Sequence, residues 1–402
     1  MIWKMKGAKT VLTLFGSIEV RRHVYQESRG GRCLIPMDEQ WGVRGHTACP
    51  RVREVCLHSS AMMTPGELVR TLSMSSMFCP SETAVRNMLG KYADAMNREG
   101  LGDKIMQELV CGAEAEPATK VFVASMDGTT VPVRQGGGEA GQAPGNLRES
   151  EGEEPLPGRF RMAMVGALGC YDIEEVFDGK AGQSVREPVR LSGDYFARMP
   201  ESGCADFKSE FEFRCFETTA KLPEKVVKIL LMDAAKWQWN HVLGDEQFDD
   251  YEKLIDYWHV CEHLASAAEH LFGDDKKSRK RWRKHWRRKL KRESGAVAAL
   301  LRSMLRYLNE RPLTTKAREQ VQKQMNYFTN HAHMMDYARF RRNGWPIGSG
   351  PVEAACKTLV KERMCRSGMR WTNEGGQTIL DIRSLIKSNR WETFWEHAKN
   401  AA

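Results

Sequence analysis

Three acidic residues lie where catalytic carboxylates are often found, at the end of an apolar segment or the start of a helix. Asp127 follows the apolar run KVFVASM, and Asp233 follows KVVKILLM. Glu353 falls in the first turn of a helix that GSGP introduces, since Pro is favoured at the first helical position and Ser or Gly before it. Carboxylate oxygens are hard ligands that suit Mg²⁺. Two such ions about 4 Å apart serve phosphodiester chemistry by activating one oxygen and stabilising the leaving oxygen.

Each of these carboxylates also has an ordinary explanation. A glutamate in the first turn of a helix satisfies unpaired backbone N–H groups and the helix dipole. The chain contains 52 Asp and Glu residues, so chance triples are numerous. The spacing alone therefore leaves the metal site open, and the fold must bring the three side chains together.

Cations are concentrated in two segments. In KKSRKRWRKHWRRKLKR (276–292), Trp282, Trp286 and Leu290 recur every fourth residue and form one apolar stripe, which predicts a docked amphipathic helix. Its remaining charge is denser than an ordinary solvated face and favours DNA phosphates as partners. The predicted DNA contacts of this helix are Arg279, Lys280, Arg283, Lys284, Arg287 and Arg288. A second cationic track follows Glu353 and consists of Lys357, Lys361, Arg363, Arg366 and Arg370.

The totals place few limits on function. The 402 residues suffice for two or three domains, and 61 Lys and Arg against 52 Asp and Glu give a formal charge of +9. No apolar run approaches the roughly 18–20 residues of a membrane helix. The eleven cysteines include no CxxC pair, which indicates a reduced, intracellular protein.

The N-terminal third reads as a β-hairpin followed by helices. Residues 8–25 predict a hairpin with Gly16-Ser17 as a type II′ loop. A capping box from Thr64 to Glu67 begins one helix, and Cys79-Pro80-Ser81 begins a second. This pair resembles a helix-turn-helix that would place Arg86 and Lys91 against DNA, although plain helical hairpins are also common.

The rest of the chain alternates between strands and helices. Apolar runs predict strands at 120–126, 160–173, 225–232 and 253–255, with a helix near 205–220 and helices throughout 274–341. Residues 111–118 read as a linker, and the Gly-, Glu- and Pro-rich residues 135–158 as a flexible loop. This pattern predicts an α/β sheet whose active edge lies at the strand ends.

Two segments contain residue types that can bind zinc. Cys33, His46, Cys49, Cys56 and His58 lack the tight spacing of zinc ligands, so zinc is not expected there. The segment 259–263 fits H-x-x-E-H, a zinc-protease pattern, but five-residue motifs also arise by chance.

The ordered motifs MDGTTV, LLMDAAKWQWN, LIDYWHVCEHL, PIGSGPVEAACKTLVKERM and GMRW resemble a bacterial insertion-sequence transposase of the ISKra type, distantly similar to mutator-like transposases. The resemblance covers roughly residues 118–395. It implies a ribonuclease H-like core with Asp127, Asp233 and Glu353 as catalytic, metal-holding residues. It also implies that Asp256, His259 and Trp237 lie near them and orient DNA or the metal ligands. Relatives often carry a Cys-paired zinc ribbon near the hairpin, whereas only Cys33 stands there in this chain.

The resemblance also implies a domain division. A degenerate zinc-ribbon-like hairpin (1–50) precedes a helical DNA-binding region (51–115) and the first part of the core (116–264). A basic helical insertion (265–335) then separates it from the Glu-bearing part (336–402).

The expected function is metal-dependent cleavage at the ends of an insertion sequence, followed by attack of the freed 3′-hydroxyl on target DNA. The expected metal is Mg²⁺, for which Mn²⁺ can substitute, and the expected partner is double-stranded DNA. The resemblance further implies a homo-oligomer in the cytoplasm, at the nucleoid. The alternative is a transposase-derived DNA-binding protein without catalysis.

Overall fold

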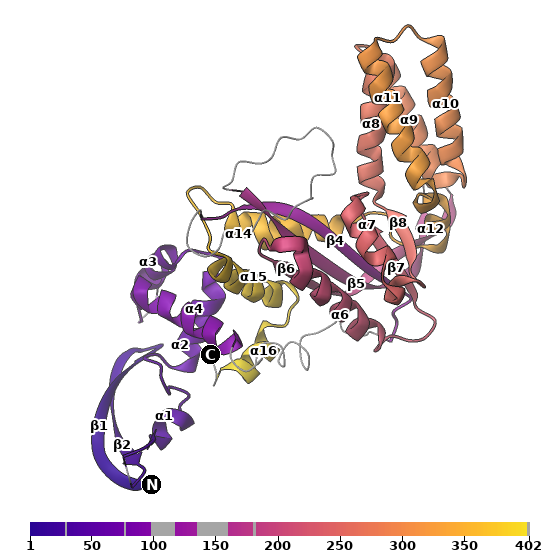
Figure 1. Cartoon of the computed structure of the whole chain (residues 1–402). Coiled ribbons are helices and arrows are strands. Elements are labelled where there is room, and N and C mark those ends of the chain that lie inside the picture. The colour runs from indigo at the N-terminus through magenta and orange to yellow at the C-terminus, as the bar shows by residue number, and fades with distance from the viewer. Residues whose placement is uncertain (29, 76–77, 98–116, 135–159, 180–181, 400–402) are drawn as a thin grey trace.

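The computed structural model describes residues 1–28, 30–75, 78–97, 117–134, 160–179 and 182–399. Its centre is a five-stranded sheet in the order β6-β5-β4-β7-β8 (Figure 1). β4, β7 and β8 are parallel, and β5 is antiparallel to both of its neighbours. The strands are β4 (Val121–Pro132), β5 (Phe160–Asp178), β6 (Gln183–Arg198), β7 (Val227–Met232) and β8 (Glu252–Ile255). This is the mixed α/β class that the sequence predicts.

The central parallel strands β4 and β7 form because their residues are mostly apolar on both faces, as buried parallel strands require. Val121 to Met126 in β4 and Ile229 to Met232 in β7 are all buried. β6 is absent from the sequence-based prediction. It is an edge strand with Pro188 in its middle, and such a strand needs few apolar residues.

Helices cover both faces of the sheet. On one face, Phe207 and Phe211 of α6 (Ala205–Thr219) pack against Phe196 of β6. On the other, Leu380 of α15 (Asn373–Lys387) shares a core with Val165 of β5. Further helical segments are α7 (Lys236–Leu243), α12 (Tyr337–Asn343), α13 (Gly350–Ala355), α14 (Glu362–Met364), α16 (Trp391–Ala398), η3 (Ser202–Cys204), η4 (Glu246–Phe248), η5 (Ala332–Met334) and the π-helix η6 (Cys356–Lys361).

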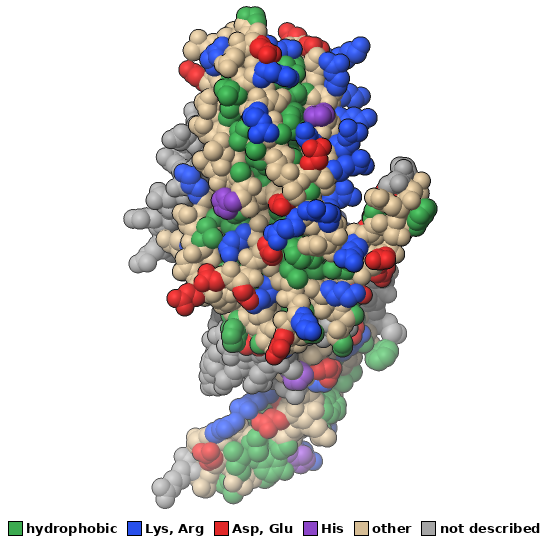
Figure 2. Space-filling model, turned by 90° about the vertical axis from the view of Figure 1, so that its right-hand side faces the viewer, with side chains coloured by type: hydrophobic (Ala, Val, Ile, Leu, Met, Phe, Trp, Pro, Cys, Tyr) green, Lys and Arg blue, Asp and Glu red, His purple; other side chains and the backbone are tan. Residues whose placement is uncertain are grey.

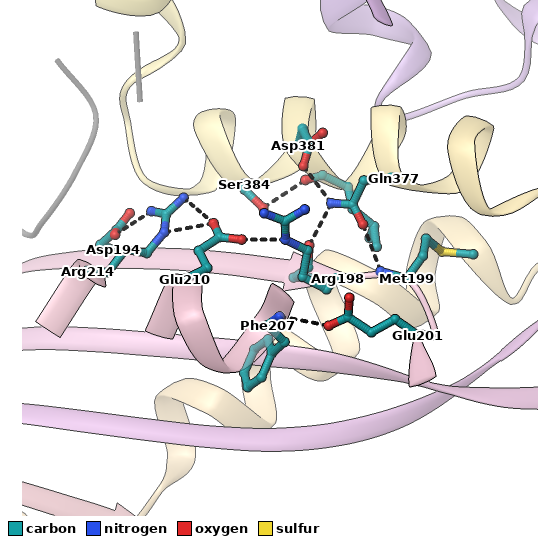
Figure 3. A network of polar contacts seen from close by, with 12 residues as sticks. Asp194, Arg198, Met199, Glu201, Phe207, Glu210, Arg214, Gln377, Asp381 and Ser384 are labelled. Atoms are coloured by element: carbon teal, nitrogen blue, oxygen red, sulfur yellow. Dashed lines mark hydrogen bonds and ion pairs between the residues drawn. The ribbon is translucent and has the colours of Figure 1, made fainter. Parts of the chain in front are cut away.

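A polar network fastens α6, β6 and α15 together (Figure 3). Arg214 of α6 donates to Asp194 at 2.6 Å and to Glu210 at 2.9 Å, and Arg198 donates to Glu210 at 2.5 Å. Burial alone would raise the pKa of Glu210, but the two arginines outweigh it and lower that pKa. Gln377 of α15 donates to the carbonyl of Ala197 and so ties this helix to β6.

Four helices project from the β8 side of the sheet (Figure 1). They are α8 (Tyr257–Phe272), α9 (Lys276–Arg292), α10 (Ala296–Glu310) and α11 (Thr315–His331). Trp282, Trp286 and Leu290 are buried, which confirms the predicted apolar stripe of the basic helix. Because α8 is continuous from Tyr257, the predicted boundary between 264 and 265 falls inside a helix.

The N-terminal elements lie at the opposite end of the molecule from the four helices (Figure 1). They are β1 (Ile2–Thr13), β2 (Gly16–Gln26), β3 (Cys33–Leu34), α1 (Pro36–Gln40), α2 (Pro50–Ser60), α3 (Pro65–Ser75) and α4 (Glu82–Asn97). The predicted hairpin loop is wrong by two residues. Thr13 pairs with Gly16, so the loop is Leu14-Phe15, and Gly16 takes a φ of 103° at the start of β2. The capping box is confirmed, because the Glu67 N–H donates to the Thr64 hydroxyl at 3.2 Å.

Two other predictions fall largely on residues outside the described ranges: the loop 135–158 and the linker 111–118. Within the described ranges, no helix combines the length and apolar character needed to cross a bilayer.

Buried arginines join the N-terminal helices to the part of the chain that carries Glu353. Arg383 of α15 donates to the carbonyls of Leu359 and Thr358 in the π-helix and of Ala61 at the end of α2. A π-helix and a helix C-terminus both leave carbonyls without regular partners, and the guanidinium occupies them. This side chain therefore fixes the position of α2 relative to the helix after Glu353.

Replacing Arg383 with Ala should lower the free energy of unfolding by roughly 3 kcal/mol, because several buried carbonyls lose a charged donor. Urea unfolding measures the effect. Arg318→Ala, at an exposed position of α11, is the matched control and should change that free energy by about 0.5 kcal/mol or less. Equal effects of the two substitutions would show that the buried contacts contribute nothing.

Candidate active site

Strand register brings three aspartates to one edge of the sheet. Met232 pairs with Ile255, so Asp233 and Asp256 follow at the same level on β7 and β8. Ala124 pairs with Leu230, and continuing this register places Asp127 beside Asp233. Asp127 is not at the end of its strand as predicted, because β4 continues to Pro132 along β5. It lies instead just beyond the residues that pair with β7.

Hydrogen bonds to Asp256 bring the start of the Glu353 helix to the same edge. Asp256 is fully buried, and its Oδ2 accepts from the Ser349 N–H at 2.5 Å. The Ser349 hydroxyl in turn donates to Glu353 Oε1 at 3.1 Å. The other oxygen, Oδ1 of Asp256, caps α8 by accepting from the His259 N–H at 2.7 Å. Asp256 is therefore linked to Glu353 through Ser349.

Asp127 contacts the Glu353 helix from the sheet. Its Oδ2 accepts from the Cys356 thiol at 3.4 Å, and its Oδ1 accepts from the Gly128 N–H at 2.7 Å. Cys356 lies one turn after Glu353, so the three predicted carboxylates come from elements that are packed directly on one another.

The carboxylates repel one another. Burial raises the pKa of Asp233 to about 6, and nearby Asp127, Asp256 and Glu353 add to the rise, whereas His259 opposes it. Burial and then Asp256 raise the pKa of Glu353, while the hydrogen bond from Ser349 works against them. Such a cluster costs free energy when fully ionised, and a bound cation would relieve that cost.

The donor set fits Mg²⁺, because every candidate ligand atom is a carboxylate oxygen. In the described part of the chain, however, no three His, Cys, Asp or Glu side chains are close enough together to hold a metal ion. Asp127 is turned toward Cys356 and Glu353 toward Ser349 by the hydrogen bonds above. Binding a metal therefore requires these two side chains to exchange those partners for the ion.

Metal binding should depend on pH with a midpoint near the pKa of Asp233, which is about 6. Only the ionised carboxylate is a ligand, so Mn²⁺ affinity should fall up to about tenfold per pH unit below 6 and level off above it. Titration of Mn²⁺ by electron paramagnetic resonance at several pH values measures this. Affinity that stays constant between pH 4.5 and 7.5 would exclude Asp233 as a ligand.

The other predicted orienting residues take different positions. His259 Nδ1 lies 3.7 Å from Asp233 Oδ2, next to the carboxylates as expected. Trp237 packs partly against the hydrophobic core, and it is Trp239 whose indole donates to the Asp233 carbonyl at 2.7 Å.

The two histidines of the H-x-x-E-H segment face different partners. His259 lies next to Asp233, whereas His263 hydrogen-bonds Gln324 at 2.7 Å and stacks on Tyr327. Burial lowers the pKa of His263 to about 4. These contacts join α8 to α11 and give His263 a packing role.

All six predicted DNA contacts of α9 line one hollow of about 850 Å³ between α8 and α9. Lys276 and Lys291 of α9 add to its positive charge, and Glu269 of α8 is the single acidic residue in its lining. Figure 2 shows Lys and Arg side chains gathered along one edge of the projecting helices. We call this hollow the α8–α9 groove.

The second cationic track is less uniform than predicted. Lys357, Lys361 and Arg370 are exposed, but Arg366 forms a two-bond ion pair with Glu67. Arg363 is only 3% exposed and donates to the carbonyls of Ser60 and Met63 at 3.2 Å. The prediction of Arg363 as a DNA contact is therefore wrong for this conformation, because α2 covers it.

The two cations predicted to contact DNA from the helix-turn-helix, Arg86 and Lys91, also have partners within the protein. Arg86 lies 3.5 Å from Glu82, and the Lys91 ammonium donates to the carbonyl of Gly45.

Three residues of the site were missed from the sequence: Trp258, Ser349 and Cys356. Trp258 is 50% exposed, and Arg287 and Lys291 lie 5.2 and 5.3 Å from its ring centroid, between the carboxylates and the α8–α9 groove. Its position two residues after Asp256 was the available signal. The sequence contains no signal for Ser349 and Cys356, because each contacts an aspartate that is far away in the chain.

Comparisons with known proteins yield only a remote likeness. No family model matches the chain, and no curated protein matches it. A solved structure titled "Drosophila P element transposase strand transfer complex" has a TM-score of 0.27 and 12% identity, covering 91% of this chain and 82% of that chain. A likeness of this degree adds nothing to what the geometry of the site shows.

Proposed function

We propose that this chain is the DNA transposase of an insertion sequence, with a ribonuclease H-like core and with Asp127, Asp233 and Glu353 as its metal-holding residues. The observation that supports the proposal is the strand register, which when continued past Ala124 and Leu230 puts Asp127 level with Asp233, while hydrogen bonds through Asp256 and Ser349 bring Glu353 to the same edge of the sheet. The sheet order and the helices inserted after β8 are compatible with the architecture that the resemblance implies.

The chain's own groups have separable tasks in this proposal. Asp127, Asp233 and Glu353 would bind Mg²⁺ or Mn²⁺, ions that when bound activate the attacking oxygen and neutralise charge on the leaving oxygen. Asp256 keeps its buried position and sets the approach of the Glu353 helix. His259, 3.7 Å from Asp233, orients that carboxylate.

DNA would be held mainly by phosphate contacts in the α8–α9 groove. Eight Lys and Arg side chains line this groove, and Arg287 and Lys291 extend toward Trp258 beside the carboxylates. A continuous cationic path thus leads from the projecting helices to the proposed catalytic edge. Two element ends must be processed together, so a homo-oligomer is part of the proposal.

The test is cleavage of a labelled duplex that carries the flanking element ends, with Mg²⁺, with Mn²⁺ and with a chelator. Metal-dependent cuts at the element boundary are expected. DNA binding without cleavage under all three conditions would instead identify a transposase-derived DNA-binding protein. Peptide hydrolysis that requires zinc would favour the H-x-x-E-H interpretation.

A further inference from the structure

Helix α9 is flanked by a second hollow, on its α10 side. This hollow measures about 600 Å³, and its lining includes Arg281, His285 and Lys289 of α9 with Arg302 and Arg306 of α10. None of these residues lines the α8–α9 groove, and none is among the six residues of α9 named above as predicted DNA contacts. We call this hollow the α9–α10 groove.

The two grooves face in different directions. At about 100° per residue, Arg281, His285 and Lys289 lie on roughly the opposite side of α9 from Arg283, Arg287 and Lys291. The apolar stripe of Trp282, Trp286 and Leu290 is buried against the neighbouring helices and forms one border between the two sets. Arg288 of the α8–α9 groove is seven residues from Arg281 and so lies within about 20° of it around the helix, which means that α9 presents cations to two adjoining spaces.

The charge of the α9–α10 groove is partly available for a ligand. Arg306 lies 3.8 Å from Glu310, and Lys289 lies 3.2 Å from Glu293. Within the described ranges, the exposed side chains of Arg281 and Arg302 have no ion-pair partner among the protein's own acids. Exposed ion pairs are weak, so phosphates can displace the glutamates of the other two cations.

We propose that the α9–α10 groove binds a second DNA duplex, the target, while the α8–α9 groove holds the element end. This inference rests on the proposed function, because strand transfer joins two DNA molecules that must be held close together. Charge complementarity supports it: duplex DNA carries one phosphate charge per ≈ 1.7 Å and is attracted to clustered Lys and Arg. Placing both grooves on one rigid helix fixes the target relative to the end.

The experiment uses the full chain with the triple substitution Arg281→Ala/Arg302→Ala/Arg306→Ala. Binding and cleavage of the element end should stay within about twofold of wild type. Capture of a target duplex by the end-loaded protein should fall about 100-fold, because three phosphate contacts are lost. The control is Lys316→Ala/Arg318→Ala/Lys323→Ala, which removes the same charge from exposed positions of α11. It should leave end binding and target capture within about threefold of wild type.

Unchanged target capture in the triple variant would overturn the inference. Equal losses of end binding and target capture would also overturn it, since the two grooves would then hold a single DNA. Failure of the proposed function differs from failure of this inference, because in the first case the wild-type protein does not cleave the element end at all. Energy transfer between two differently labelled duplexes bound together reports on the second groove without any cleavage, and wild type should show a signal that the triple variant lacks.

Discussion

Asp233→Asn should abolish metal-dependent cleavage, with a loss of at least about 1,000-fold, or about 4 kcal/mol of transition-state stabilisation. Asp233 follows the strand that lies between β4 and β8, so its carboxylate would hold the metal together with Asp127 and Glu353. The amide keeps the shape of the side chain and removes the charge that would bind the cation. The measurement is single-turnover cleavage of the end duplex with saturating Mg²⁺.

The loss should not come from unfolding. The pKa of Asp233 is raised to about 6 in the folded protein, so the folded state favours the protonated form. Stability linked to this group is present at low pH and is lost as pH rises through about 6. The neutral amide avoids that loss, so the metal-free variant should melt at or above the wild-type temperature at pH 7.5. Mg²⁺ should raise the melting temperature of wild type and leave that of the variant unchanged.

The control for this substitution is Asp249→Asn. Asp249 is exposed and lies outside the carboxylate cluster, so cleavage should stay within about twofold of wild type. Equal cleavage by wild type and Asp233→Asn would mean that other carboxylates carry the chemistry.

The triple substitution Lys280→Ala/Lys284→Ala/Arg288→Ala should weaken DNA binding by about 100-fold at 0.1 M salt. These three exposed side chains lie along one face of α9 and line the α8–α9 groove. Each lost phosphate contact removes about one unit from the slope of log affinity against log salt, so the slope should become shallower by about three. Fluorescence anisotropy with a labelled duplex between 50 and 200 mM salt measures both quantities.

The dependence of affinity on DNA sequence distinguishes a groove that contacts phosphates from one that contacts base edges. Because phosphate contacts do not depend on sequence, the triple variant should lose affinity for element ends and for unrelated duplexes to the same degree. The α11 triple variant described above serves again as the charge-matched control. An unchanged salt slope in the α9 variant would place the DNA on a different surface.

Much of the local structure could be predicted from the sequence. The basic helix occupies residues 276–292 as its apolar stripe indicates, and β7 covers most of the apolar run that precedes Asp233. These elements depend on short-range patterns of apolar and charged residues, which a single chain displays. The sequence also supplied Asp127, Asp233 and Glu353 as candidates, because carboxylates after apolar runs and in first helical turns can be recognised locally.

Predictions failed where distant segments decide the outcome. The sequence places Arg363 in a cationic track after Glu353, but α2, whose Ser60 lies 303 positions away in the chain, covers it. Arg366 forms an ion pair with Glu67, which lies 299 positions away in the chain. β6 escaped prediction because an edge strand has one partner and tolerates Pro188 and many polar residues.

The sequence by itself determined where most of the helices and strands form, since these depend mainly on neighbours within a few positions. Only the tertiary structure decided that Asp256 is a buried support for Ser349 and Glu353, and that the cations of α9 divide between two grooves. The physical reason is that register between strands and packing of helices bring together groups far apart in the chain. Hydrogen bonding, burial and charge act on those groups only after the chain has folded.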